Sequence, residues 1–181
     1  DGGVGWSDYD NDGDMDLFVA NRGQPDQLYR NNADGTLSDV APDVGTDYPQ
    51  NEFPANSEGV AWGDYDNDGD ADLFLANLSR TNPLYWNDGD GTFIEVTRDS
   101  GIILDRKSIG ASWADLDNDG DLDAYVGNWA TQDRVFLNDG SGVFTLAFST
   151  SDSSSTADVD LGDFDNDGDL DVLLGHAGGT G

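Results

Sequence analysis

The chain contains no cysteine and only one histidine among its 181 residues. Without cysteine it cannot form a disulfide framework, an iron–sulfur cluster or a zinc site with thiolate ligands. Basic residues are also scarce: there are seven Lys and Arg against 38 Asp and Glu, and the formal net charge is −31. A field of that sign repels nucleic acids and anionic membranes and attracts cations. We therefore expect no nucleic-acid partner.

Long hydrophobic runs are missing as well. No apolar segment approaches the roughly 20 residues that a membrane-spanning helix needs, so we expect no membrane insertion. Hydrophobic residues still make up 36% of the chain, enough for a packed core. The sequence opens at Asp1 without a recognisable signal peptide, as we expect of a mature or excised product.

The acidic residues are nearly all of one kind, three Glu and 35 Asp. Many of them fall in a nine-residue pattern, Asp-x-Asp-Asn-Asp-Gly-Asp-x-Asp, which occurs four times at steps of 56, 51 and 48 residues. The four copies are residues 8–16, 64–72, 115–123 and 163–171. Repetition at a period near 50 residues is typical of proteins built from repeated supersecondary units.

Each copy lies between two short apolar segments, and in the first three repeats two further segments follow, separated by a Gly-rich turn. Turns that pair Asp or Asn with Gly between apolar runs are typical of β-hairpins. No stretch has helical periodicity. The sequence therefore predicts an all-β fold of β-propeller-type blades, each of four antiparallel strands A to D with the Asp-rich loop joining A to B. We expect a single repeat domain over 1–181, with complete blades at 4–41, 59–97 and 110–148 and half of a fourth at 157–176.

Three and a half blades do not close a propeller, which usually has four to eight. Either the chain is part of a longer one, or several copies assemble and cover the exposed blade edges.

The loop pattern predicts a calcium site. Asp at positions 1, 3, 5 and 9 can supply four carboxylates, the carbonyl of position 7 a fifth oxygen, and Gly at position 6 the backbone freedom that closes the loop. Oxygen ligands without His or Cys select hard cations, and a flexible, carboxylate-rich loop suits Ca²⁺ better than Mg²⁺. We expect about four Ca²⁺ per chain, one in each loop. The candidate ligands are Asp8, Asp10, Asp12, Asp14, Asp16, Asp64, Asp66, Asp68, Asp70, Asp72, Asp115, Asp117, Asp119, Asp121, Asp123, Asp163, Asp165, Asp167, Asp169 and Asp171.

Three other interpretations of the loops are less favoured. An EF-hand needs Glu at position 12 and flanking helices, whereas position 12 here is apolar, namely Val19, Leu75, Val126 and Leu174. Thrombospondin-like calcium repeats carry disulfides, which this chain cannot form. Acidic turns without an ion would set carboxylates against one another at a cost of roughly 4 kcal/mol per pair at 4 Å, for an effective dielectric constant near 20.

The loop, the apolar strand behind it and the segment Leu84-Tyr85-Trp86-Asn87-Asp88-Gly89-Asp90-Gly91-Thr92-Phe93 together resemble FG-GAP/VCBS-type repeats. These repeats form the calcium-binding blades of integrin α-subunit propellers and of many secreted bacterial proteins. The resemblance covers nearly the whole chain and implies that the loop Asp side chains and position-7 carbonyls are calcium ligands. It also implies a role in adhesion, glycan binding or scaffolding. The Phe-Gly and Gly-Ala-Pro signatures of the family are absent, which favours the bacterial-type branch.

Alternating strand direction predicts which loops share a face of the molecule. The calcium loops and the C–D turns lie on one face, and the B–C and D–A connections on the other. Basic residues gather on the second face, where Arg106 and Lys107 fall in a D–A connection. The candidate ligand-binding residues there are Arg22, Arg80, Trp129 and Arg134. They suit an extracellular protein or a glycan, with Arg binding carboxylates and Trp stacking; alternatively, the Arg residues only offset nearby acidic charge.

The function that the sequence favours is a secreted calcium-binding module for adhesion or ligand binding, extracellular or at the cell surface, where calcium is millimolar. The alternative is a structural protein that self-assembles into an oligomer or filament through exposed blade edges. An accessory domain of a polysaccharide-active enzyme is less favoured. We expect no enzymatic activity of the chain itself, because it offers no Ser/His/Asp or Cys/His set and its Asp residues are committed to metal.

Overall fold

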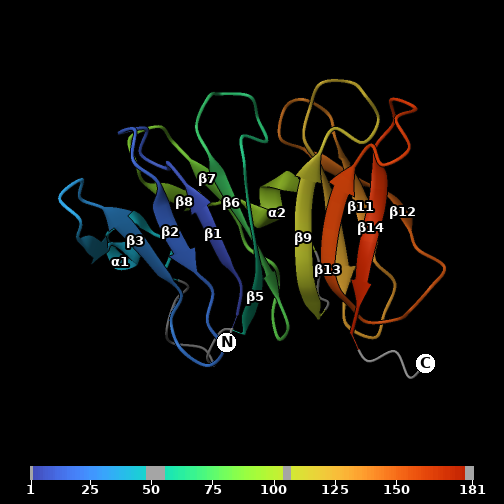
Figure 1. Ribbon diagram of the computed structural model, residues 1–181, viewed down its shortest axis with the longest axis horizontal. Coiled ribbons are helices and arrows are strands. Elements are labelled where there is room, and N and C mark those ends of the chain that lie inside the picture. Colours follow the sequence, from blue (N-terminus) through green and yellow to red (C-terminus); the bar gives the residue numbers. More distant parts are fainter. Residues whose placement is uncertain (1, 48–55, 104–106, 178–181) are drawn as a thin grey trace.

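The computed structural model describes residues 2–47, 56–103 and 107–177. This part of the chain forms three four-stranded antiparallel sheets and one two-stranded sheet (Figure 1). In every sheet the strands pair in chain order, so each sheet is a meander. The predicted fold class, propeller-like blades with three complete and a fourth half-formed, is confirmed.

The strands have the following bounds. Blade 1 contains β1 (Val4–Ser7), β2 (Asp16–Val19), β3 (Gln27–Asn31) and β4 (Leu37–Asp39). Blade 2 contains β5 (Ser57–Gly63), β6 (Asp72–Asn77), β7 (Leu84–Asn87) and β8 (Phe93–Glu95). Blade 3 contains β9 (Ser108–Ala114), β10 (Asp123–Asn128), β11 (Arg134–Asn138) and β12 (Phe144–Ser149). Blade 4 contains β13 (Thr156–Gly162) and β14 (Asp171–His176).

The blades stack face to face, and their first strands come together: β1 contacts β5, β5 contacts β9, and β9 contacts β13 (Figure 1). The backbones approach closely at this inner edge. A Cβ added to Gly59 on β5 would lie only 2.5 Å from the carbonyl oxygen of Ile109 on β9, so any larger residue would push the blades apart.

Hydrophobic packing lies between blades, because strands covered on both faces direct side chains to both neighbours. Trp62 of blade 2 packs edge-on against Phe18 of blade 1, with ring centroids 6.3 Å apart. Trp113 of blade 3 packs in the same way against Phe74 of blade 2, at 5.7 Å. The third junction is smaller, because Leu161 stands where the other junctions have Trp. Each blade thus completes its core only when the next one is present.

Two single-turn helices, α1 (Ala41–Val44) and α2 (Thr97–Ser100), follow the fourth strands of blades 1 and 2. The sequence did not predict them, since one turn is too short to show periodicity. Each turn ends at a glycine in the left-handed conformation, Gly45 with φ of 90° and Gly101 with φ of 81°.

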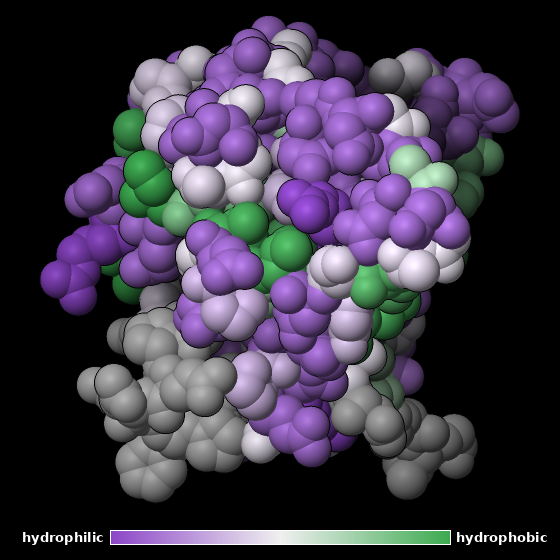
Figure 2. All heavy atoms as spheres, turned by 90° about the vertical axis from the view of Figure 1, so that its left-hand side faces the viewer, coloured by the Kyte–Doolittle hydropathy of each residue, from purple (hydrophilic) through white to green (hydrophobic). Residues whose placement is uncertain are grey.

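The outer face of blade 1 carries a strip of hydrophobic side chains among hydrophilic ones, although it packs on no other blade in the described part of the chain (Figure 2). Val4 is 61% exposed and Trp6 is 55% exposed. Their equivalents in blade 2, Val60 and Trp62, pack into the core shared with blade 1. The outer face of blade 1 therefore carries the same apolar side chains as the faces that other blades use for packing.

Candidate metal centres

The four Asp-rich loops share one backbone conformation. Asn at position 4 has a positive φ in each loop, between 54° and 63°, and Gly at position 6 has φ between 95° and 100°. Asp8 at position 1 of the first loop accepts the backbone N–H groups of Asp12 and Gly13, both at 3.0 Å. The equivalent bonds recur in loops 2, 3 and 4 at 3.0 to 3.1 Å. Hydrogen bonds within the nine residues therefore hold each loop in its conformation.

The position-9 carboxylate ties the loop to its blade. Asp72 is fully buried and accepts the N–H of Asn87 at 2.8 Å and that of Tyr65 at 3.1 Å. Asp16 and Asp123 are buried and bonded in the same way to strand C and to position 2 of their own loops. One carboxylate thus joins the loop, strand B and strand C in each of the first three repeats.

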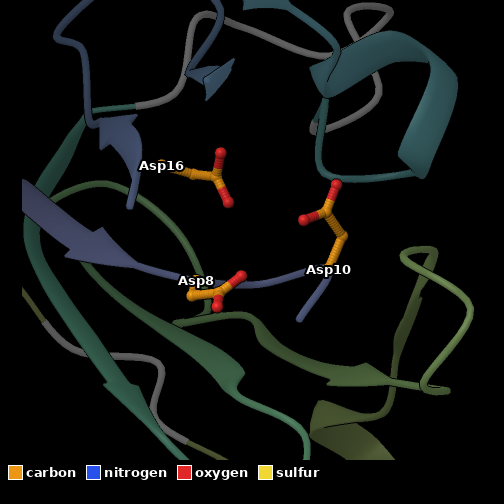
Figure 3. A group of neighbouring side chains, drawn as sticks. All are labelled: Asp8, Asp10 and Asp16. Carbon is orange, nitrogen blue, oxygen red and sulfur yellow. The ribbon is translucent and has the colours of Figure 1, made fainter. Parts of the chain in front are cut away.

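In each loop the carboxylates of positions 1, 3 and 9 come together. In loop 1, one oxygen from each of Asp8, Asp10 and Asp16 lies within 4.8 Å of the others, and the three groups turn toward a common space (Figure 3). The same grouping recurs in the other loops, as Asp64, Asp66 and Asp72; Asp115, Asp117 and Asp123; and Asp163, Asp165 and Asp171. The structure thus assembles twelve of the predicted ligands into four equivalent groups.

The side chains of positions 5 and 7 fall outside these groups of three. At position 5, a carboxylate oxygen of Asp12 accepts the N–H of Asp14 at 3.0 Å, closing a local turn, and Asp68, Asp119 and Asp167 do the same in their loops. Position 5 as a carboxylate ligand and position 7 as a carbonyl ligand both stay predictions. The position-7 residues are Asp14, Asp70, Asp121 and Asp169.

Burial and repulsion between carboxylates raise the pKa values of several loop aspartates. The pKa of Asp72 is raised to about 8, mainly by burial and also by the charges of Asp66 and Asp68, although two backbone N–H groups act in the opposite direction. Burial is also the main reason why the pKa values of Asp16 and Asp123 lie above their ordinary range. A carboxylate whose pKa is raised in this way binds a proton or a cation more readily than an ordinary carboxylate does.

One oxygen in the first group has no hydrogen-bond partner. Oδ1 of Asp10 is buried, and no donor in the described part of the chain reaches it. A buried carboxylate oxygen is normally hydrogen-bonded or bound to a cation, because desolvation of an unpaired anion is costly. The donor set around it consists of carboxylate oxygens alone, which is the chemistry that hard divalent cations prefer.

A second set of residues around the loops was not predicted from the sequence. Nδ2 of Asn87 donates to the carbonyl of Tyr9 at 2.7 Å, and Nδ2 of Asn138 to that of Tyr65 at 2.7 Å. Each bond runs from strand C of one blade to the loop of the preceding blade. The only sequence signal is an Asn fifteen residues after position 9 in repeats 1 to 3.

The opposite face of the molecule holds a further polar connection that the sequence analysis did not assign. Asp26, which is 2% exposed, accepts the hydroxyl of Ser57 at 2.7 Å. Asp133 accepts that of Thr156, also at 2.7 Å. In both cases the residue lies in a B–C connection and its partner begins strand A of the next blade. The blades are therefore joined by polar contacts at both faces.

The four predicted ligand-binding residues lie at the face away from the loops. Arg22 pairs through its guanidinium with the largely buried carboxylate of Glu58. Trp129 follows the end of β10, is 42% exposed, and donates its backbone N–H to the carbonyl of Lys107. Arg80 follows β6, and Arg134 is the first residue of β11. Arg106 lies outside the described residues. The pairing with Glu58 fits the alternative that Arg22 offsets acidic charge.

Comparison with known proteins defines the class of this chain. The family described as FG-GAP-like repeat matches residues 8–75, 64–126 and 115–174, so the chain belongs to the family of FG-GAP-like repeat proteins. Each match begins at position 1 of one loop and ends in strand B of the next repeat. The expected bacterial-type branch of this family stays a prediction.

Among individual proteins, the chain is similar to cartilage acidic protein 1. Identity is 33% over 102 residues with the protein from Xenopus tropicalis, and 30% over 102 residues with those from Homo sapiens and Mus musculus. The matched region is 56% of this chain and 15% of each relative, so the likeness covers a small part of each relative's length. None of the helices in the described part of the chain has the length and hydrophobicity needed to cross a bilayer.

Proposed function

We propose that the four loops bind Ca²⁺, about one ion each, and that the chain is a calcium-stabilised module for adhesion or ligand binding. The observation that carries the proposal is the recurrence, in all four loops, of three carboxylates within 4.8 Å of one another. Three anions at that separation repel strongly unless protons or a cation offset them. The membership of the family is in line with this assignment.

The residues present fit the ion. Positions 1, 3 and 9 would hold it through their carboxylates, and the unpartnered Oδ1 of Asp10 offers a free lone pair in the first loop. Bound Ca²⁺ would supply positive charge that offsets the three carboxylates of each group. The chain's own contribution is to hold the three carboxylates in place before binding, by the hydrogen bonds to positions 1 and 9.

The location and role of the module are also proposals. Calcium sites of modest affinity are filled at extracellular concentrations, and the relatives are named for cartilage. We propose secretion or display at the cell surface, binding of a protein or glycan, and no catalytic role. Arg22, Arg80, Trp129 and Arg134 are the candidate contacts, and Arg22 also pairs with Glu58. Replacing Trp129 with Ala should abolish binding to any glycan found by array screening; unchanged binding would remove this face from consideration.

The calcium assignment is tested by titrating the protein with Ca²⁺ in a calorimeter. Asp66→Asn keeps the shape of position 3 in loop 2 but removes its charge, and should eliminate one of about four binding events. Asp43→Asn is the matched control, because Asp43 is exposed on α1, away from the loops. The same stoichiometry for wild type and Asp66→Asn would contradict the assignment of loop 2.

A second candidate function, self-assembly, is favoured by the outer face of blade 1. A second copy of this chain could cover Trp6 with its own blade 4, where Phe164 and Leu173 are each 57% exposed. The contact would continue the packing seen between blades, in which Trp62 meets Phe18. Head-to-tail contacts of this kind are heterologous and extend into rings or filaments.

Sedimentation velocity in Ca²⁺ tests this candidate. We expect a mass that grows with protein concentration for wild type and a monomer for Trp6→Glu. Ile94→Glu is the control, since Ile94 is half-exposed on β8 and lies on neither end blade. A wild-type monomer at all concentrations would rule out self-assembly.

A further inference from the structure

A ladder of side-chain hydrogen bonds joins each loop to the loop of the following blade. At the first junction, Nδ2 of Asn11 lies 2.5 Å from Oδ1 of Asp70. In each case the donor is the Asn at position 4 and the acceptor is the Asp at position 7 of the next loop. The other two pairs are Asn67 with Asp121 at 2.8 Å and Asn118 with Asp169 at 3.4 Å. The contact occurs at all three junctions, so it is a property of the repeat.

The backbone at position 4 shows why the residue type matters there. Asn11, Asn67 and Asn118 have φ of 54°, 59° and 63°, in the left-handed region. Glycine adopts this conformation without a steric cost, whereas Asn only tolerates it. If position 4 only had to form a turn, Gly would therefore be equally suitable there. The Asn side chain adds the amide that reaches the neighbouring loop.

The acceptor also lies close to a turn of its own blade. Oδ2 of Asp70 faces Gly89 in the C–D turn of its own blade, where an added Cβ would lie 2.5 Å from that oxygen. Gly140 stands in the same relation to Asp121. One carboxylate oxygen thus accepts a hydrogen bond from the preceding loop, and the other lies close to the adjoining turn. Asp70 and Asp121 are also the residues whose backbone carbonyls are the predicted fifth ligands of their loops.

We propose that this asparagine ladder couples the metal occupancy of neighbouring loops. The proposal rests on the proposed function, since it requires that the loops bind Ca²⁺. Filling loop 1 orders Asn11, which holds Asp70 and so pre-organises loop 2 for its own ion; Asn67 and Asn118 act in the same way at the next two junctions. These Asn residues are positioning residues and touch no ion. Because coupling between sites is reciprocal, occupancy of loop 2 also favours occupancy of loop 1.

Repulsion between neighbouring ions acts against this coupling, and the negative charge of the loops reduces it. Each loop carries five carboxylates, so a loop that holds one divalent ion remains anionic. The ladder itself joins an uncharged amide to a carboxylate and adds no like-charge contact. The net effect is positive cooperativity, with each filled loop strengthening its neighbour about fivefold.

The test compares two substitutions of the same chemistry. Asn67→Gly keeps the left-handed backbone and removes the amide that reaches loop 3. Asn166→Gly makes the same change in loop 4, whose Asn has no following loop in the described part of the chain. In a calcium titration, Asn67→Gly should bind the ions of loops 2 and 3 about fivefold more weakly and with a shallower curve. Asn166→Gly should retain the wild-type steepness.

The outcomes separate this proposal from the one that it rests on. If wild type takes up no Ca²⁺, the proposed function fails. If wild type binds about four ions and Asn67→Gly gives a superimposable curve, the ladder is overturned and the calcium sites stand.

Thermal melting gives a second readout. A purely structural amide would lower the Tm equally in Ca²⁺ and in chelator, and that result would also overturn the proposal. Coupling requires a larger loss of Tm in Ca²⁺ than in chelator for Asn67→Gly, with no such difference for Asn166→Gly.

Discussion

Repeats 2 and 4 carry the same nine-residue pattern in very different surroundings. In repeat 2, Asp72 is fully buried and accepts N–H groups from Tyr65 and from Asn87 of strand C. In repeat 4, Asp171 is exposed and accepts the N–H of Phe164 at 3.0 Å, with no strand-C donor in the described part of the chain. Both loops nevertheless group their three carboxylates within 4.8 Å. The motif therefore sets the conformation of the loop, while strand C and the next blade set its burial.

Burial should decide how well each loop functions. A loop whose carboxylates are already fixed and partly dehydrated loses less entropy on binding an ion than an open one does. The comparison of repeats 2 and 4 thus predicts that equal motifs differ in stability, affinity and pH response.

The largest expected difference concerns stability in excess chelator. Asp72→Asn leaves one of two buried N–H groups without an acceptor, which should lower the free energy of unfolding by about 3 kcal/mol, or the Tm by about 6–12 °C. Asp171→Asn changes an exposed group and should cost less than about 0.5 kcal/mol. Differential scanning calorimetry measures both. Equal losses of stability in the two variants would contradict the difference proposed between repeats 2 and 4.

A smaller effect is expected on calcium affinity. Loop 4 should bind its ion about tenfold more weakly than loop 2, because rigid sites bind calcium more tightly than open ones. In a calorimetric titration, Asp165→Asn should therefore remove the weakest binding step and Asp66→Asn a tight one. The comparison fails if both substitutions remove steps of the same affinity.

The third expected difference concerns pH dependence. The pKa of Asp72 is raised to about 8, above its value in the unfolded chain, so the metal-free native state binds more protons between roughly pH 4 and 8. Metal-free stability should therefore fall, and the Tm with it, as the pH rises through this window, while calcium affinity rises because the ion no longer competes with a proton. Asp72→Asn should reduce this dependence and Asp171→Asn should not. A metal-free Tm that rises with pH would contradict the assignment.

Much of the architecture followed from the sequence. The apolar segments on either side of each loop predicted strands A and B, and β1, β5, β9 and β13 lie where strand A was expected. Gly turns located the C–D hairpins. These features are local, so spacing along the chain was enough to find them.

The contacts between blades could not be predicted in the same way. Asn87 reaches the carbonyl of Tyr9, 78 residues away, and Asp26 reaches Ser57. Such pairs depend on which strand ends meet when the sheets stack, and a single sequence contains no signal for that distance. The grouping of positions 1, 3 and 9 without position 5 also depends on rotamers, because the carboxylate of Asp12 closes a turn.

Melting of the wild-type protein in Ca²⁺ and in excess EDTA, combined with metal analysis by mass spectrometry, tests the central claim most directly. We predict about four Ca²⁺ per chain and a Tm lower by at least about 10 °C in EDTA, restored when Ca²⁺ is added back. Identical melting curves in the two conditions, or a protein that retains no calcium after exchange into calcium-containing buffer, would contradict it.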